Sequence, residues 1–242
     1  RLSLNVAKTE FLLFRPNRKK NCTITLSLNK TKIRESNKIK YLGVLLDGNL
    51  SWNSHISELC KKLGCAVGML HRIKNFCSTD TLKSIYYALF HSHLTYGLSV
   101  WGHASASLTK KIILLQKRAV RAIAKADYLA HTGPIFKNLE ILKFADQFKL
   151  NLISMMWDFD HCKIPNSLND LFQRPIHSYN TRFVKQGKLV PCKINTNKFG
   201  SHSIRYEGTC ILNLLKSSKI YLENSSKKTF IYKCKSEIIA SY

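Results

Sequence analysis

Hydrophobic and polar positions change their period along the chain, and the change divides it into two parts. From Phe11 to Leu46 the pattern is typical of strands, with an apolar FLLF segment, an alternating CTITLSLN segment and the apolar run IKYLGVLL. One face of the alternating segment carries Cys22, Ile24, Leu26 and Leu28. A turn is expected at Asn29-Lys30. These segments predict a small antiparallel sheet that ends near Leu46.

The last apolar run contains a glycine, Gly43, in the middle of an expected buried strand. A glycine inside a strand pattern indicates that a second backbone or a ligand approaches closely. The run ends in the turn pair Asp47-Gly48, and Ser51 then stands in a position suited to cap a helix. The sequence therefore predicts a strand that leads directly into a helix start.

After Ser51, apolar residues recur every three or four positions as far as Ile73, which predicts a long helix. Gly64 and Gly68 in this helix are four residues apart, a spacing that suggests close packing. Further helices are expected from Thr79-Asp80 to just before Tyr96, over residues 107–126, and from Phe144 to Phe159. Beyond about Gln173 the pattern weakens into polar sequence with prolines.

These patterns predict an α+β protein in three parts. Residues 1–50 form the small N-terminal antiparallel sheet, residues 51–172 form a mainly helical region, and residues 173–242 form a mixed or irregular C-terminal extension.

The helix expected over residues 107–126 separates basic from apolar side chains. At 100° per residue, six cations fall within about 120° of arc: Lys110, Lys111, Lys117, Arg118, Arg121 and Lys125. The opposite side carries Leu108, Ile112, Leu115, Ala119 and Ile123. No acidic residue occurs between Asp80 and Asp127, so the cations lack the partners that usually accompany them on a solvated helix face. A surface that follows phosphates is therefore favoured over a plain solvated face, and Lys61 and Arg72 extend it.

The overall charge supports the same interpretation. The 242 residues contain 39 Lys and Arg against 14 Asp and Glu, a formal net charge of +25. So large an excess indicates a polyanionic partner, and nucleic acid is favoured over a general effect on solubility. No run approaches the roughly 18 apolar residues of a membrane span, so no membrane partner is expected.

The eight cysteines are scattered through the chain, and no Cys-x-x-Cys pair occurs. Cys60 and Cys65 lie five residues apart on an expected helix, about 140° around it, so they do not share a zinc ion. We interpret the cysteines as free thiols that pack in the core, in a reducing compartment. An intracellular location, nuclear or cytoplasmic, is expected.

Several motifs together carry a resemblance to a known family. The segments LSLNVAKTEFLLF and IKYLGVLLDGNLSWNSHI closely resemble the end of the palm in reverse transcriptases of non-LTR retrotransposons, the LINE-type, jockey- or CR1-like elements. Tyr86, Tyr96-Gly97, Trp101-Gly102, QKRAVRAI and HSYNTRF resemble the thumb and the region beyond it. The segment ILNLL at 211–215 departs from the family, in which a Trp-Asn pair is expected.

The resemblance implies roles for particular residues. Tyr41, Leu42 and Gly43 match the primer grip, the turn that holds the 3′ end of the growing strand against the palm. Lys8 matches a lysine near the phosphates of the incoming nucleotide, with Asn5 and Thr9 shaping its turn, although an exposed lysine at a strand edge explains Lys8 equally well. The implied partners are an RNA template and a DNA primer.

The catalytic carboxylates of such a polymerase are missing from this sequence. Two-metal nucleotidyl transfer needs clustered carboxylates that hold Mg²⁺. Asp158 and Asp160 are two apart, about 200° around a helix, and are expected to be solvated. No catalytic residue, metal ligand or cofactor is therefore expected here, and Mg²⁺ belongs to the parent polymerase.

Two functional classes follow, and a decayed copy of such an element is a third possibility. The first is a part of an RNA-directed DNA polymerase, inactive alone, that binds primer and template. The second is a stand-alone or domesticated nucleic-acid-binding protein without enzymatic activity.

Overall fold

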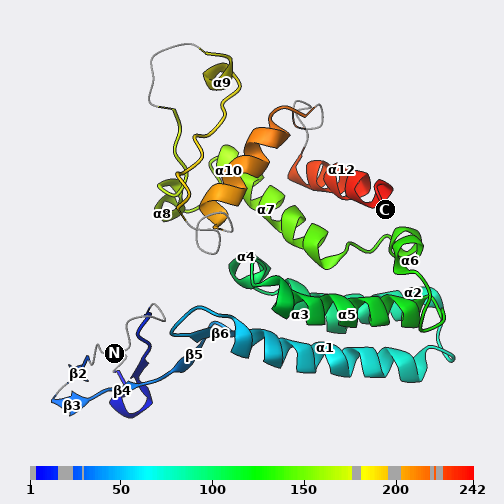
Figure 1. The fold of residues 1–242 in the computed structure, drawn as a ribbon, viewed down its shortest axis with the longest axis horizontal. Coiled ribbons are helices and arrows are strands. Elements are labelled where there is room, and N and C mark those ends of the chain that lie inside the picture. The colour runs from blue at the N-terminus through cyan, green and yellow to red at the C-terminus, as the bar shows by residue number, and fades with distance from the viewer. Residues whose placement is uncertain are drawn as a thin grey trace.

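The computed structural model describes residues 4–15, 24–28, 30–175, 181–195, 203–218, 221 and 226–242. Within this part, short strands come first and helices follow, which confirms the α+β class (Figure 1). Cys22, Asn29 and the first four residues of HSYNTRF, for which a strand face, a turn and a family motif were expected, lie outside the described residues.

The strands form three separate two-stranded sheets rather than one. After the short helix η1 (Val6–Lys8), β1 (Glu10–Phe11) pairs in parallel with β4 (Arg34–Glu35). β2 (Ser27–Leu28) pairs antiparallel with β3 (Thr31–Lys32). β5 (Lys38–Tyr41) pairs antiparallel with β6 (Val44–Asp47).

The alternating segment is correspondingly shorter than expected as a strand. Ile24 and Leu26 lie outside β2, and their side chains remain 39% and 42% exposed. Alternation alone predicts a longer strand with one buried face, but in the described residues the strand covers only Ser27–Leu28 and the two apolar side chains before it stay partly exposed.

A short loop joins the last strand to the first long helix, α1 (Asn53–Ile73). The Asp47 carboxylate organises this loop, because its Oδ1 accepts hydrogen bonds from the backbone N of Asn49 and Ser51 and its Oδ2 accepts one from Ser51 Oγ. Ser51 is therefore not the N-cap. The buried residue Trp52 occupies that position with φ +64° and without a side-chain hydrogen bond.

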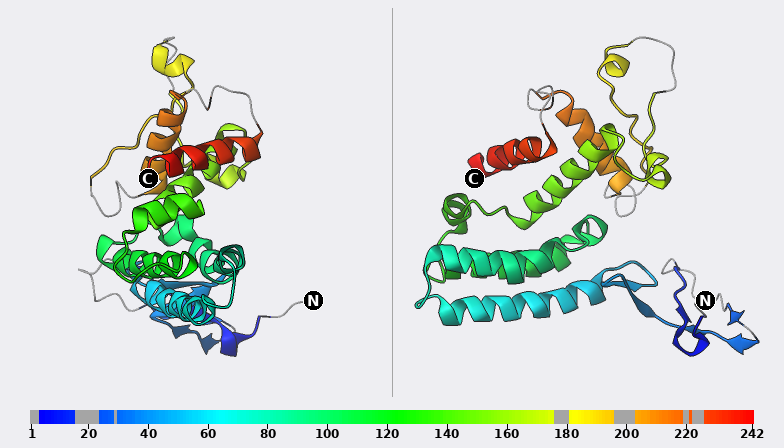
Figure 2. Two further views of the ribbon diagram at one scale, coloured as in Figure 1. Left: turned by 90° about the vertical axis from the view of Figure 1, so that its right-hand side faces the viewer. Right: turned by 180° about the vertical axis from the view of Figure 1, so that it is seen from behind.

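The helical body consists of three rods that lie side by side with their axes roughly aligned (Figures 1 and 2). α1 and α5 (Ala106–Ile123) run in the same direction and pack on each other. A rod of opposite direction packs beside both, made of α2 (Thr79–Ile85), the π-helix η2 (Tyr86–His91) and α3 (Ser92–Thr95). The short α4 (Leu98–Trp101) follows. The shared core includes Leu63, Leu70, Leu82, Tyr86, Phe90 and Ile112, all fully buried.

A buried glutamine completes this core. Gln116 of α5 donates from Nε2 to the carbonyl of Leu142 (2.8 Å) and to Tyr86 Oη (3.1 Å). Its Oε1 accepts from the backbone N of Phe144 (2.9 Å). Helical periodicity assigned Leu115 to the apolar side, yet Leu115 is half-buried and Gln116 is 1% exposed. The buried hydrogen bonds compensate for the cost of removing the amide from water.

The glycines of α1 do not mark close packing, contrary to the expectation from their spacing. A Cβ added at Gly64 or Gly68 would meet nothing within 4 Å. Several cysteines also depart from the expected core positions, because Cys65 and Cys162 are exposed. All the described cysteines are free thiols.

The rest of the chain stacks on the far side of the body. α6 (Thr132–Leu139) leads to α7 (Phe144–Asp160), close to the helix expected over 144–159. The short helices α8 (Asn166–Asn169) and α9 (Arg182–Lys185) follow, and then α10 (Ile204–Leu215) and α12 (Lys227–Ala240), which both pack against α7 (Figure 1).

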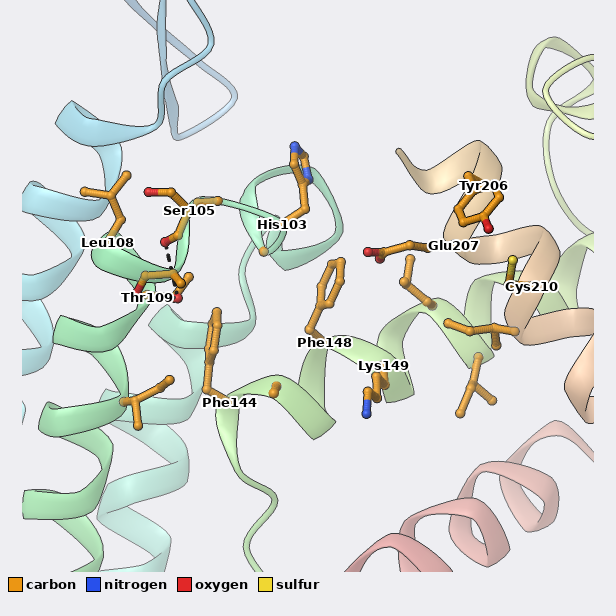
Figure 3. Close-up of a pocket in the computed structure, with 18 of the residues that line it drawn as sticks. His103, Ser105, Leu108, Thr109, Phe144, Phe148, Lys149, Tyr206, Glu207 and Cys210 are labelled. Carbon is orange, nitrogen blue, oxygen red and sulfur yellow. Dashed lines mark hydrogen bonds between the residues drawn. The ribbon is translucent and has the colours of Figure 1, made fainter. Parts of the chain in front are cut away.

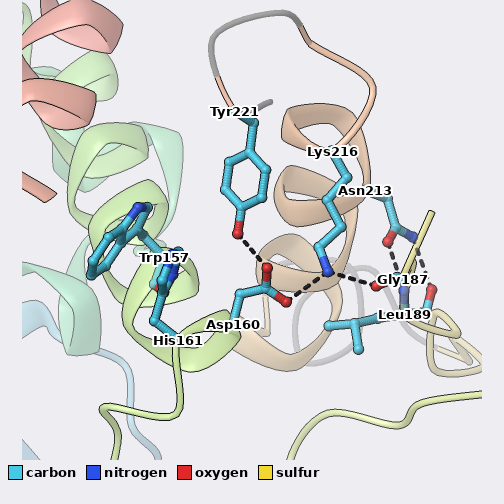
Figure 4. A network of polar contacts seen from close by, with 8 residues as sticks. All are labelled: Trp157, Asp160, His161, Gly187, Leu189, Asn213, Lys216 and Tyr221. Atoms are coloured by element: carbon cyan, nitrogen blue, oxygen red, sulfur yellow. Dashed lines mark hydrogen bonds and ion pairs between the residues drawn. The ribbon is translucent and has the colours of Figure 1, made fainter. Parts of the chain in front are cut away.

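Asp158 and Asp160 fasten this C-terminal region to α7, and the expectation that they are only solvated is wrong. Lys227 Nζ contacts Asp158, and Lys216 Nζ lies 2.6 Å from Asp160 Oδ1. Tyr221 Oη donates to Asp160 Oδ2 at 2.5 Å (Figure 4). Burial alone would raise the pKa of Asp160, but the hydrogen bonds from Lys216 and Tyr221 outweigh it and hold this pKa below its ordinary value.

Candidate nucleic-acid interface

The run that contains Gly43 is a hairpin and not a single strand. Tyr41 pairs with Val44, so the loop between β5 and β6 consists of Leu42 and Gly43 alone. Their φ angles are +45° and +84°, the left-handed values that a two-residue type I′ turn needs at both central positions. Gly43 takes this conformation without strain, whereas Leu42 is held in it. Tyr41 and Leu42 are 63% and 74% exposed, so the turn projects into solvent.

A tyrosine from the helical body fixes this turn. Tyr96, immediately after α3, donates its hydroxyl to the carbonyl of Leu42 at 2.5 Å. A Cβ on Gly43 would lie 3.0 Å from the Tyr96 ring, so only glycine allows the ring to come so close. A close approach at Gly43 is present, but the neighbour is the Tyr96 ring of the same chain and not the second backbone or ligand that the sequence predicted.

The residues around Tyr96 hold it in place. Trp101 Nε1 donates to the Tyr96 carbonyl at 2.9 Å. Gly97 has φ +61°, and a Cβ there would lie 3.0 Å from Val44 Cγ2. The two glycines, one in the hairpin and one in the helical body, thus allow these two parts to meet.

A histidine of α1 makes a second connection to the hairpin. The backbone N of Leu45 donates to His55 Nδ1 at 3.3 Å, and the His55 ring lies 5.5 Å from that of Trp101. Burial lowers the pKa of His55, which keeps Nδ1 available as an acceptor. The sequence analysis did not identify His55, since a lone histidine carries no motif.

The expected basic helix exists, but its six cations are not equivalent. Lys110, Lys111 and Arg118 are exposed on α5. Lys117 and Arg121 are half-buried, and Arg121 Nε donates to the carbonyl of Ala130 at 2.9 Å. Among the ion pairs found in the described residues, none involves a cation of α5.

Lys125 lies beyond the helix that was expected to contain it. α5 ends at Ile123, and Lys125 has φ +52°. The backbone N of Ala126 bonds to the carbonyl of Arg121 and that of Lys125 bonds to the carbonyl of Ala122, the two bonds of a Schellman cap. The direction of the Lys125 side chain is therefore set by the cap and not by helical periodicity.

Two exposed cations of α5, Lys111 and Arg118, lie along the seam between α1 and α5. Burial raises the pKa of Cys60, and the charge of Lys111 opposes the rise, which places Lys111 close to this residue of α1. The same relation recurs further on, where Arg118 lies near His71. Lys61 and Arg72 are exposed, but each is one residue past Cys60 or His71 and so is turned about 100° around α1, away from this seam. Burial, then the charges of Lys74 and Arg118, lower the pKa of His71.

The structure places Lys8 on η1, where its side chain is exposed. Thr9 Oγ1 donates to the carbonyl of Asn5 at 2.8 Å, so the expected turn around Lys8 is present. The role that the resemblance implies for Lys8 stays a prediction.

The described residues also enclose an apolar groove that sequence reasoning missed. It measures about 1370 Å³ and lies between α5 and α7 on one side and α10 on the other (Figure 3). Phe144, Phe148 and Leu214 contribute to its lining, with His103, Lys149 and Glu207 as polar members. None of the predicted site residues lines the groove. Its lining comes from segments that are distant in sequence, so no local motif predicts it.

Metal-ligating residues do not gather in the described part of the chain: no group of three or more His, Cys, Asp or Glu is placed to hold an ion. Asp158 and Asp160 do not fit Mg²⁺, because lysine side chains already neutralise both carboxylates. None of the described helices has the length and apolar character needed to cross a bilayer.

Comparison with known proteins gives consistent matches. The chain is 31% identical over 127 residues to the RNA-directed DNA polymerase from mobile element jockey of Drosophila melanogaster, a match that covers 51% of this chain. It is 26% identical over 151 residues, or 61% of this chain, to the jockey polymerase of Drosophila funebris. It is 27% identical over 128 residues to the probable RNA-directed DNA polymerase from transposon BS of Drosophila melanogaster.

The resemblance to non-LTR retrotransposon polymerases is confirmed. The chain spans only 14–16% of the length of these jockey and BS polymerases. No family model matches the chain. No solved structure matches it either.

Proposed function

We propose that this chain binds a primer–template duplex as part of an RNA-directed DNA polymerase. The turn of Tyr41, Leu42 and Gly43 acts as the primer grip, and the exposed cations of α5 contact the phosphates. The similarity to jockey-type polymerases supports the parent activity. The observation that carries the proposal is the pair of exposed cations of α5, Lys111 and Arg118, on the seam with α1, together with a hairpin whose turn is exposed and fixed.

Electrostatics favours a sequence-tolerant contact. The exposed cations of α5 make no ion pair with a carboxylate in the described residues, so a phosphate does not have to displace one. Each neutralised phosphate releases counterions, and such contacts position a duplex without specifying its sequence. The chain alone is proposed not to extend primers, because the carboxylates that resemble a chelating pair, Asp158 and Asp160, serve as anchors for the C-terminal region.

A salt titration of duplex binding tests the proposal. Lys111→Gln combined with Arg118→Gln removes two exposed cations of the seam. Because each lost contact flattens the slope of log K against log salt concentration by about 0.9 for a DNA duplex, this double variant is expected to flatten it by nearly 2. Arg121 is avoided because it also holds Ala130.

The matched control combines Lys193→Gln with Lys228→Gln, two exposed lysines outside the seam. Equal changes in the two double variants would show that the net charge acts diffusely and that the seam has no special role. Primer extension by the purified chain, abolished by changing Asp158 and Asp160, would contradict the proposed inactivity.

A further inference from the structure

Large apolar side chains project from the end of the helical body that lies opposite the hairpin. We call this end the distal tip and define it as the connection between α1 and α2 (residues 74–78) and that between α5 and α6 (residues 124–131). Because α1 and α5 are parallel, both connections lie at the same end (Figures 1 and 2). Phe76 and Leu129 are each 88% exposed, and Tyr128 is 68% exposed. A group of this kind marks an interaction site.

The backbone presents these side chains on ordered turns. The backbone N of Ala130 donates to the carbonyl of Asp127 at 3.1 Å, which places Tyr128 and Leu129 at the centre of a β-turn. Arg121 fixes the end of this turn through Ala130. The backbone N of Phe76 likewise donates to the carbonyl of Ile73 at 3.0 Å. Preorganised side chains of this kind bind with a small loss of conformational entropy.

The charges around the tip favour a nucleic acid over an apolar protein surface. Lys125 and Arg72 are exposed there, and Lys74 and Arg118 are close enough to influence His71. Asp127 is the acidic residue within the two connections that form the tip, residues 74–78 and 124–131. Aromatic rings among cations are the features with which proteins hold unpaired bases, through stacking on the rings and contacts with the phosphates.

The length of the helical body relates the tip to the hairpin. The rod consists of α2, η2 and α3, which have seven, six and four residues. One end of the rod adjoins the connection that contains Phe76, and the other end adjoins Tyr96, whose hydroxyl contacts Leu42. At about 1.5 Å per residue this rod is about 25 Å long. A duplex covers this length in about seven base pairs at the roughly 3.4 Å rise of B-form DNA, and in up to about ten at the smaller rise of an A-like RNA–DNA hybrid.

We propose that Phe76 and Tyr128 stack on unpaired bases that flank a bound duplex, about seven to ten base pairs from the strand end held at Leu42 and Gly43. The proposal rests on the proposed function, because it places the single strand relative to the duplex. It assigns the distal tip to single-stranded nucleic acid and gives the bound duplex a defined length.

Binding of matched hybrids to the whole chain tests this proposal. The probes are a blunt, cross-linked RNA–DNA hybrid of about seven to ten base pairs, and the same hybrid with a single-stranded extension at the end away from the primer 3′ end. The extension is expected to tighten binding about tenfold in the unchanged protein. Phe76→Ala and Tyr128→Ala should each remove most of this gain without weakening binding of the blunt hybrid, whereas Phe76→Trp should keep it. Tyr232→Ala, at a 70% exposed aromatic on α12, is the control.

The outcomes separate the two proposals. No gain from the extension, or equal losses on blunt and extended hybrids, overturns the assignment of the tip. Binding of anionic lipid vesicles that depends on Phe76, with hybrid binding unchanged, also overturns it. Failure of the unchanged protein to bind the blunt hybrid contradicts the proposed function instead. Circular dichroism of each variant confirms folding, which exposed side chains are not expected to affect.

Discussion

The hydroxyl of Tyr96 donates to the carbonyl of Leu42 across 54 positions of sequence, at a distance of 2.5 Å. This bond joins the helical body to the exposed turn of the β5–β6 hairpin. Because Leu42 is held at φ +45°, the bond supports a backbone conformation that leucine rarely adopts.

Tyr96→Phe keeps the ring and removes only the hydroxyl. We expect a local loss of about 1 kcal/mol, the usual net contribution of one hydrogen bond, with global stability little changed. Hydrogen exchange of the amides at residues 42–45 should become faster. Tyr232→Phe on α12 serves as the control, and exchange that stays unchanged in Tyr96→Phe would show that the bond does not hold the turn.

Gly97→Ala tests the close contact between Gly97 of the helical body and Val44 of the hairpin. Alanine is strained at φ +61°, and its Cβ would lie 3.0 Å from Val44 Cγ2, so we expect a destabilisation of about 1–2 kcal/mol. Gly68→Ala in α1 meets no neighbouring atom and should instead stabilise by about 0.5–1 kcal/mol, because alanine favours a helix interior. Urea unfolding should show that the free energy of unfolding falls in Gly97→Ala and rises in Gly68→Ala.

Gln116→Leu removes three buried hydrogen bonds at once. Leucine has a similar size, but it leaves the Tyr86 hydroxyl, the Leu142 carbonyl and the Phe144 amide without their partner. We expect a loss of about 3–5 kcal/mol, seen as a lower midpoint in thermal or urea unfolding. Leu114→Gln, at a 49% exposed position of the same helix, should change stability by less than about 0.5 kcal/mol.

Asp160 gives the protein a defined response to acid. The pKa of Asp160 is lower in the folded protein than its ordinary value of 3.8. Its contribution to the free energy of unfolding is therefore complete above pH 3.8 and is lost as the pH falls through the folded-state pKa. Asp160→Asn should cost about 2 kcal/mol at neutral pH. Urea unfolding from about pH 5 to about pH 2 should show the variant losing less stability than the unchanged protein.

Glu58→Gln is the comparison for this prediction. Glu58 forms an exposed pair with Lys62 at 3.7 Å, and its removal should cost less than about 0.5 kcal/mol. Parallel pH curves for the unchanged protein and Asp160→Asn would contradict the role of Asp160.

Periodicity predicted the helices well because each buries one face in a common core. The helices expected over 107–126 and 144–159 are found at Ala106–Ile123 and Phe144–Asp160. Periodicity failed where a side chain's partner comes from a distant segment. Gln116 is buried because Tyr86, Leu142 and Phe144 surround it, and Asp160 is paired because Lys216 and Tyr221 reach it.

The exposure of the cations on α5 was predicted only in part, because it too depends on contacts with distant segments. Charge periodicity identified the exposed cations Lys110, Lys111 and Arg118 correctly, since exposure follows from helix geometry. It could not show that Arg121 bonds to Ala130 or that Lys125 leaves the helix, because both depend on how the chain turns after Ile123. The exposed Phe76 and Tyr128 lie in loops, where no period applies.

The π-helix Tyr86–His91 makes the effect of a deletion on Tyr96 depend on where in the rod the deletion lies. A π turn accommodates an extra residue within a helix, and every later residue is rotated relative to an uninterrupted α-helix. Deleting the exposed Ala88 would let the rod continue as an α-helix and keep Tyr96 directed toward Leu42, because five α-helical residues turn through nearly the same angle as six residues of a π-helix. A related chain that is one residue shorter within this segment would therefore keep the connection, whereas losing one residue from the α-helical part of the rod would rotate Tyr96 by about 100° away from Leu42.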